Sequence, residues 1–160
     1  MLTITRKLEF DAGHRIPNHS SKCKNIHGHR YVLEVTVAGP LQRTQGASDE
    51  GMVVDFSIVK EVMNEHVVDK WDHAFLCWEH DTVMLTALRQ FPSDHKHVIL
   101  REVPTVENLA KRAFALLGLP FIEYGLRLVH LRLFETPNCW AELHDFNYQE
   151  GRSDASAIKD

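Results

Sequence analysis

Three histidines near the N-terminus have the spacing of a metal site. His27 and His29 are separated by one residue in an extended segment, so both side chains point to the same face, because side chains alternate along a strand. His14 ends the preceding alternating segment, on its apolar face. If the two strands pair as neighbours, the three imidazoles converge at one edge of a buried sheet face. Imidazole is the commonest metal-ligating side chain, and three histidines with an open fourth position are typical of a catalytic zinc.

Cys23 leaves two interpretations of this site open. Three residues separate it from His27, and as a fourth ligand it would close the coordination sphere and make the zinc structural. In the alternative, the fourth position stays open and the site is catalytic. The protein also holds 11 histidines, so a His-Gly-His segment could arise from composition alone. These residues by themselves do not decide between the interpretations.

Five further residues allow both a chemical and a purely structural explanation. Asp72 directly precedes His73, and a carboxylate beside an imidazole can fix the tautomer of the ring. The alternative is that the two are loop residues with no shared role, since adjacent side chains rarely hydrogen-bond each other. Glu135 ends a predicted strand on its apolar face, where a carboxylate needs a partner: a ligand with two N–H groups, an arginine or water. Thr105 and Glu107 begin a predicted helix, and an N-cap followed by a first-turn acid accounts for both.

The composition indicates one soluble globular domain. The chain has 160 residues, 44% of them hydrophobic and 25% charged, and we assign 1–148 to the domain and 149–160 to a polar, frayed tail. A net charge of −4 without a dense Lys/Arg run argues against nucleic-acid binding. The sequence shows no membrane-spanning segment and no signal-peptide pattern, so a cytoplasmic location is expected. Three cysteines without disulfide-framework spacing suit a reducing compartment.

Hydrophobic periodicity predicts an α+β fold. Strands are predicted at 2–10, 31–37, 98–100, 126–135 and 140–147, with a short return strand at 52–54. Helices are predicted from residue 56 to about 69, at 83–91, and from residue 106 until Gly118 and Pro120 end the third one. This order predicts an antiparallel sheet with two helices on one face.

Taken in order, the motifs of this chain resemble those of the 6-pyruvoyltetrahydropterin synthase / 6-carboxytetrahydropterin synthase family. Each motif is short, but the ordered set is specific and spans about residues 8–145. The matching segments are FDAGH (10–14), CKNIHGH (23–29), VDF (54–56), DHAFL (72–76), PTVEN (104–108) and ET (135–136).

The resemblance implies a tunnelling fold (T-fold): a four-stranded antiparallel sheet with two helices on one face, joined into a trimeric barrel and a homohexamer of two trimers. Such closure removes exposed sheet edges. Active sites in this family lie between subunits. By matching position, the resemblance implies that Zn²⁺ is bound by His14, His27 and His29. It implies that Cys23 is the catalytic thiol, with Asp72 and His73 as its acid–base partners. It also implies that Glu135 anchors the pterin and that Thr105 and Glu107 line the same pocket.

The gap of three residues between Cys23 and His27 resembles the spacing in the 6-carboxytetrahydropterin synthase branch of the family. That branch converts 7,8-dihydroneopterin triphosphate to 6-carboxy-5,6,7,8-tetrahydropterin, triphosphate and acetaldehyde, on the path to 7-deazapurines such as queuosine. The alternatives are a 6-pyruvoyltetrahydropterin synthase and a non-catalytic, zinc-stabilised pterin-binding oligomer. One departure is the segment 77–101, which is longer than in the shortest members of the branch.

A triphosphate substrate needs a local basic patch on a protein that is acidic overall. Four basic residues flank the metal motif and are candidates for this role, with ordinary solvated loop charges as the alternative. They are Arg15, Lys22, Lys24 and Arg30.

Overall fold

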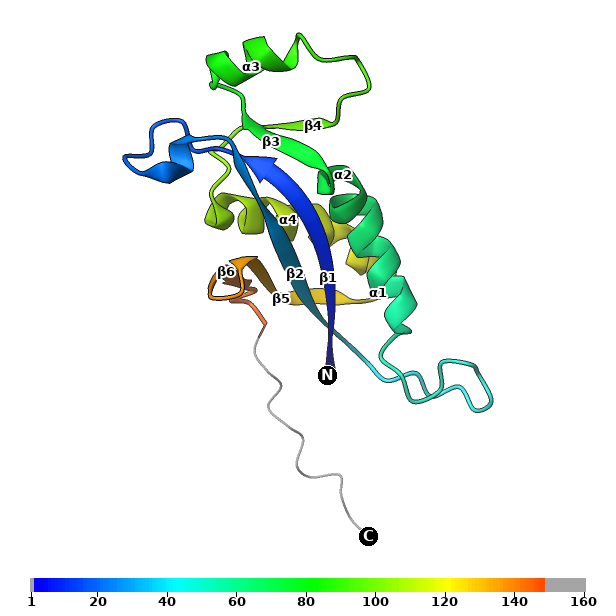
Figure 1. The fold of residues 1–160 in the computed structure, drawn as a ribbon. Coiled ribbons are helices and arrows are strands. Elements are labelled where there is room, and N and C mark those ends of the chain that lie inside the picture. Colours follow the sequence, from blue (N-terminus) through cyan, green and yellow to red (C-terminus); the bar gives the residue numbers. More distant parts are fainter. Residues whose placement is uncertain (1, 149–160) are drawn as a thin grey trace.

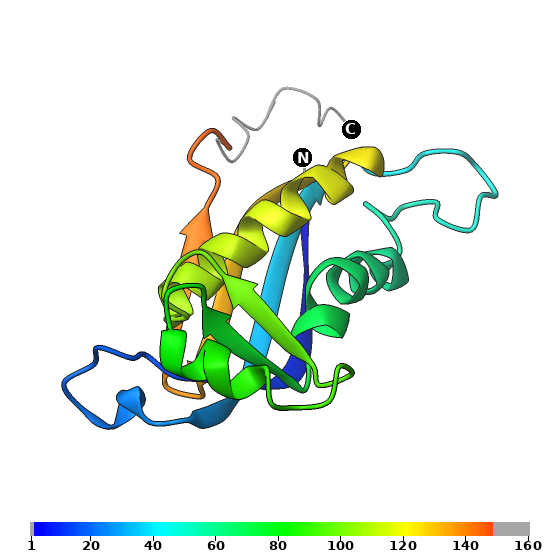
Figure 2. The same cartoon turned by 90° about the horizontal axis from the view of Figure 1, so that it is seen from above.

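A computed structural model describes residues 2–148; the tail predicted at 149–160 lies outside the described residues. A curled sheet with strand order β4-β3-β1-β2-β5-β6 forms one layer, and the helices α1, α2 and α4 lie against one of its faces (Figure 1). Seen from above, α4 crosses the sheet beside α1 (Figure 2). No helix in the described part of the protein is long and apolar enough to cross a membrane.

Two long strands form the centre of the sheet. β1 (Leu2–His14) pairs antiparallel with β2 (His27–Gly39) along the full length of both strands. Both extend beyond the predicted ranges 2–10 and 31–37, because their ladder continues through Gly13 and Gly28. A Cβ at Gly28 would lie 2.9 Å from the carbonyl oxygen of Ala12, so this close approach requires glycine.

β5 (Arg127–Thr136) and β6 (Cys139–His144) continue the antiparallel sheet beside β2, as predicted. The four-stranded sheet that the resemblance implies is too small, since β3 (Ala74–Trp78) and β4 (His97–Leu100) add two short parallel strands on the β1 side of the sheet. β4 confirms the strand predicted at 98–100. The sequence pattern assigned no element to β3. It forms because the free edge of β1 supplies its backbone partners.

The first predicted helix is confirmed as a nearly continuous run of α1 (Phe56–Met63), a π-helical segment (Asn64–Val68) and α2 (Asp69–Trp71). Asp55 caps it by accepting a 2.7 Å hydrogen bond from the Ser57 amide. The prediction of a return strand at 52–54 is wrong, because this stretch is irregular and bends before the cap. α3 (Thr82–Leu88) confirms the second predicted helix with a shorter range.

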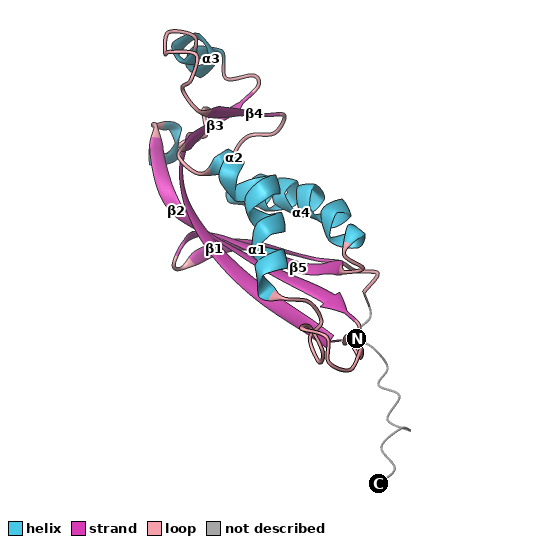
Figure 3. Ribbon diagram, turned by 90° about the vertical axis from the view of Figure 1, so that its right-hand side faces the viewer, coloured by secondary structure: helices cyan, strands magenta, loops and turns pink. Residues whose placement is uncertain are grey.

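α4 (Val106–Glu123) runs past the predicted stop and contains Pro120. Leu117 and Phe121 are fully buried on its core stripe, so their packing continues the helix across the proline, and Gly125, in the left-handed region at φ 69°, follows its end. Figure 3 shows α1 and α4 on the same side of the curved sheet. Between sheet and helices lies the apolar core, whose fully buried side chains include Tyr31, Leu33 and Val35 from β2, Met63 from α1, and Leu109 from α4.

Candidate active site

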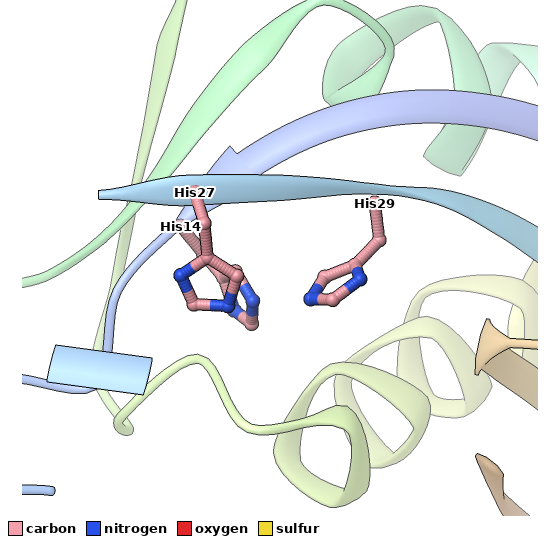
Figure 4. A group of neighbouring side chains, drawn as sticks. All are labelled: His14, His27 and His29. Carbon is pink, nitrogen blue, oxygen red and sulfur yellow. The ribbon is translucent and has the colours of Figure 1, made fainter. Parts of the chain in front are cut away.

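The three predicted metal ligands converge at one end of the β1–β2 ladder (Figure 4). His14 is the register partner of His27, and His29 lies opposite the small residue Ala12, which leaves room for its ring. The centroid of the His14 ring is 4.5 Å from that of His27 and 5.2 Å from that of His29. One donor nitrogen from each ring lies within 4.8 Å of the other two. The predicted convergence is confirmed.

Backbone carbonyls fix the tautomers of two of these rings. His14 Nδ1 donates a 2.7 Å hydrogen bond to the Pro104 carbonyl, and His27 Nδ1 donates a 2.8 Å hydrogen bond to the Asn25 carbonyl. Because a carbonyl oxygen only accepts, both Nδ1 atoms carry the proton and both Nε2 atoms keep a lone pair. Metal-binding histidines usually donate their second ring N–H in this way, and the hydrogen bond holds the ring in the orientation that ligation needs.

The histidine centre fits a zinc ion. The Nε2 atoms of His14 and His29 are buried and have no hydrogen-bond partner among the residues described, which is costly unless a ligand satisfies them. Burial lowers the pKa of His14 to about 4, and burial also lowers the pKa of His29. Both rings are therefore neutral at neutral pH, which is the form that binds metal.

Cys23 stands apart from the three imidazoles. It lies in a short 3₁₀ turn, η1 (Lys22–Lys24), and its carbonyl accepts a 2.8 Å hydrogen bond from the Ile16 amide. Its thiol is half-buried and free, and it is not among the donor atoms that cluster within 4.8 Å of one another. This geometry favours the open coordination sphere over the closed one.

Glu135 lies beside the histidine centre. Its Oε1 is 3.6 Å from His14 Nε2 and 3.8 Å from His29 Nε2. The same carboxylate faces a hollow of about 590 Å³ that Phe134 and Thr136 also line. The hollow has the size range of small-molecule sites. Glu135 can therefore accept hydrogen bonds from a ligand that also reaches the metal position.

Asp72 and His73 do hydrogen-bond each other, contrary to the rule for adjacent side chains. His73 Nδ1 is 2.9 Å from Asp72 Oδ2, and His73 has a left-handed backbone with φ 57°. The backbone of Asp11 fixes both partners, because its amide donates to Asp72 Oδ1 at 2.9 Å and its carbonyl accepts from the His73 amide at 2.6 Å. The Asp11 amide is the main reason that the pKa of Asp72 is lowered. The pair is thus an ionised carboxylate orienting an exposed imidazole.

The dyad Asp72–His73 and the histidine centre occupy opposite faces of the sheet. The dyad clusters with the side chain of Asp11, which pairs with Arg30 across the ladder at 3.1 Å. Strand alternation places Asp11 on the face opposite to that of its buried neighbours Phe10 and Ala12. Within one subunit, the dyad therefore points away from the three imidazoles.

Thr105 and Glu107 occupy the N-terminus of α4, directly after Pro104. The Thr105 hydroxyl accepts from the Asn108 amide at 3.4 Å, and Glu107 is exposed in the first turn. The side chain of Asn108 donates to the Val103 carbonyl at 2.9 Å, which stabilises the same turn. The segment thereby presents the Pro104 carbonyl to His14. Contact of Thr105 or Glu107 with a ligand stays a prediction.

Two of the four candidate triphosphate ligands are already paired. Arg15 forms a bidentate pair with the buried Asp81, at 2.6 Å for both contacts, and Arg30 pairs with Asp11. Lys22 and Lys24, in η1, are exposed. Arg15 is therefore not free to bind an anion, whereas the two lysines are available.

Comparison with known proteins gives a consistent result. The 6-pyruvoyl tetrahydropterin synthase family model matches residues 3–145. A 6-carboxy-5,6,7,8-tetrahydropterin synthase from Rickettsia bellii is 36% identical over 147 residues, which cover 89% of this protein and 100% of the relative. Another enzyme of that name, from Haemophilus influenzae, is 32% identical over 153 residues, covering 94% and 100%.

Two solved structures share the fold. An uncharacterized protein from Wolinella succinogenes aligns with a TM-score of 0.74 and 21% identity, covering 90% of this protein and 98% of that one. The 6-pyruvoyl tetrahydropterin synthase of Caenorhabditis elegans aligns with a TM-score of 0.58 and 24% identity, covering 89% and 94%. At these identities the likeness supports the T-fold architecture.

Proposed function

The chain belongs to the 6-pyruvoyl tetrahydropterin synthase family, and we propose that it is a zinc-dependent 6-carboxy-5,6,7,8-tetrahydropterin synthase. As a member of this family it is a lyase that acts on a pterin triphosphate. The proposed reaction converts 7,8-dihydroneopterin triphosphate and one water to 6-carboxytetrahydropterin, triphosphate and acetaldehyde. The names of the relatives that match nearly the whole sequence support this branch, as does the gap of three residues between Cys23 and His27.

The observation that carries the zinc dependence is the pair of buried, unpartnered Nε2 atoms in a cluster of three imidazoles. His14, His27 and His29 would hold the ion, and the fourth position would remain open to substrate. When bound there, zinc supplies a Lewis acid that polarises the side-chain oxygens of the substrate.

The remaining chemistry falls to groups of the protein. Cys23, as a thiolate, would remove a carbon-bound proton from the side chain of the substrate. His73 would relay protons to the intermediate, with Asp72 holding its ring in one orientation. Glu135 would accept hydrogen bonds from the amino and ring N–H groups of the pterin, and Thr105 and Glu107 would line the same pocket.

The positions of these groups support an active site shared between subunits. Each subunit holds the dyad and the histidine centre on opposite faces of its sheet, so a dyad from a neighbouring subunit would complete each site. This fits a homohexamer of two trimers. Lys22 and Lys24, exposed beside the metal motif, are the charges available for the triphosphate.

We place the reaction in the cytoplasm, on the path to 7-deazapurines such as queuosine. The three free cysteines, Cys23, Cys77 and Cys139, suit a reducing compartment.

Product analysis tests this proposal directly. The zinc-loaded full-length protein is incubated with 7,8-dihydroneopterin triphosphate, and the products are measured by mass spectrometry together with an acetaldehyde assay. We expect 6-carboxytetrahydropterin and one equivalent of acetaldehyde. The 6-pyruvoyl product without acetaldehyde would move the protein to the other branch, and pterin binding without turnover would identify a non-catalytic oligomer.

A further inference from the structure

A second cluster of metal-ligating side chains lies on the face of the sheet opposite to the helices. His130 on β5 is the register partner of His144 on β6, and Glu142 precedes His144 by two residues on the same face. One donor atom from each residue lies within 4.8 Å of the other two. Their proximity depends on the pairing of two strands, so no local sequence pattern indicates this cluster.

The His130 ring lies largely buried against the ring of His144. The two rings stack with centroids 4.3 Å apart, and the His130 side chain is only 17% exposed. Its Nε2 has no hydrogen-bond partner in the part of the protein that the structure describes, although Glu142 Oε2 is 3.5 Å away. Burial, and next the neighbouring His144, lower the pKa of His130.

The carboxylate of Glu142 is ionised and held in place. Arg132 donates a 2.7 Å hydrogen bond from Nε to its Oε2, and the Nη2 atom of the same ion pair is also 2.7 Å from this oxygen. This pairing lowers the pKa of Glu142. Oε1 is left 3.8 Å from His144 Nε2. Arg132 thus orients the Glu142 carboxylate beside the two imidazoles, in the way that hydrogen bonds from neighbouring residues orient metal ligands.

The cluster also has space and an entry path. A hollow of about 290 Å³ adjoins the two rings, and Thr36, Asp145 and Tyr148 help to line it. Water or these oxygen groups could complete a coordination sphere. The side chain of His144 is 57% exposed, so its ring can turn toward an arriving ion.

We propose that His130, Glu142 and His144 form a second binding site for a divalent transition-metal ion, separate from the histidine centre. Two imidazoles and one carboxylate suit zinc and its neighbours, whereas magnesium and calcium prefer oxygen ligands. An ion held there would tie the edge strand β6 to β5. The site is independent of the proposed reaction, since none of its ligands belongs to the candidate active site.

Metal stoichiometry tests the site in the full-length protein. Metal-free protein is dialysed against zinc, passed through a desalting column and analysed for bound metal by mass spectrometry. We expect two zinc ions per subunit for the unmodified protein and one for His144→Gln. One ion for the unmodified protein, or two for the variant, would overturn the proposal.

His97→Gln is the matched control. His97 is also an exposed histidine beside another one, with its ring centroid 6.3 Å from that of His95, but no carboxylate joins that pair into a ligand group among the described residues. This variant should keep two ions. A loss of one ion in His97→Gln as well would mean that exposed histidines bind zinc without selectivity, and would also overturn the proposal.

A measurement on the unmodified protein guards against a folding defect in the variant. Paramagnetic cobalt, added beyond the first equivalent, should selectively broaden the ring resonances of His130 and His144 in an NMR spectrum. Unchanged resonances of these two rings at two equivalents would exclude the site. Turnover should be the same in His144→Gln and the unmodified protein, which separates this result from any failure of the proposed reaction.

Discussion

His14 and Pro104 are joined by a 2.7 Å hydrogen bond that spans 90 positions of the sequence. It links the end of the first strand to the start of α4, so the orientation of one metal ligand depends on a helix formed much later in the sequence. The histidine centre is therefore built by the tertiary fold and not by the His-Gly-His segment alone.

His27→Ala should remove one zinc ion per subunit and abolish turnover, because it deletes a ligand from the open three-histidine site. Metal analysis and a product assay on the same preparation measure both effects. His80→Ala is the control, since His80 is exposed and outside the metal clusters. A His27→Ala protein with the full zinc content would show that this site assignment is wrong.

Cys23→Ala should keep its zinc and lose about 10²–10⁴-fold in kcat, the usual contribution of a positioned acid or base. Zinc should be kept because the thiol is not among the clustered donor atoms that would bind it. Cys139→Ala, which changes an exposed free cysteine, should keep both zinc and activity. Loss of zinc from Cys23→Ala would instead identify a closed, structural site.

Mixing two inactive variants should restore activity if each site is shared between subunits. Cys23→Ala and His73→Ala subunits, refolded together, should regain about a quarter of the unmodified activity, because random assortment pairs an intact thiol with an intact dyad in that fraction of sites. Each variant refolded alone is the control. A mixture no more active than its parts would place the complete site within one subunit.

Asp81→Ala should destabilise the fold by about 3 kcal/mol, because it leaves the Arg15 guanidinium half-buried without its partner. Arg15 lowers the pKa of Asp81, so the ion pair stabilises the folded protein above about pH 4 and this contribution is lost as the pH falls further. Urea unfolding at pH 7 and at acidic pH measures the difference. The gap between variant and unmodified protein should narrow in acid. Glu65→Ala, at an exposed position, should have little effect at either pH.

The metal-free protein should lose stability as the pH falls from about 6.5 to about 4. Burial lowers the pKa of His14 to about 4 in the folded state, while the unfolded protein takes up a proton near pH 6.5. The unfolded state therefore binds more protons in this window, and stability rises with pH across it. Denaturant unfolding of chelated protein at several pH values checks this, and a flat profile would contradict the buried, neutral ring.

Local patterns predicted the part of the site that lies on one ladder. The alternation around His14 and His27 fixes their face, and the pairing of neighbouring strands then brings the rings together. The cap at Asp55 and the antiparallel order of the long strands follow from equally local signals.

Other features depend on contacts that leave no mark in the sequence. A backbone carbonyl such as that of Pro104 can support a ligand whatever its side chain is, and β3 forms because β1 offers a free edge. The helix continues through Pro120 since Phe121 packs into the core, and Arg15 is occupied by a partner 66 positions away. Each of these results from tertiary packing overriding a local preference.

The placement of Asp72–His73 and the three imidazoles on opposite sides of the sheet has a consequence for the cell. If each active site is shared between subunits, as proposed, a subunit that has folded but not yet assembled holds the dyad and the histidine centre back to back, and neither group could act on a substrate bound at the other. Chemistry would then begin only when subunits meet, so specific activity should rise with protein concentration. The enzyme would be silent while newly made and dilute, and assembly itself would be its activation step.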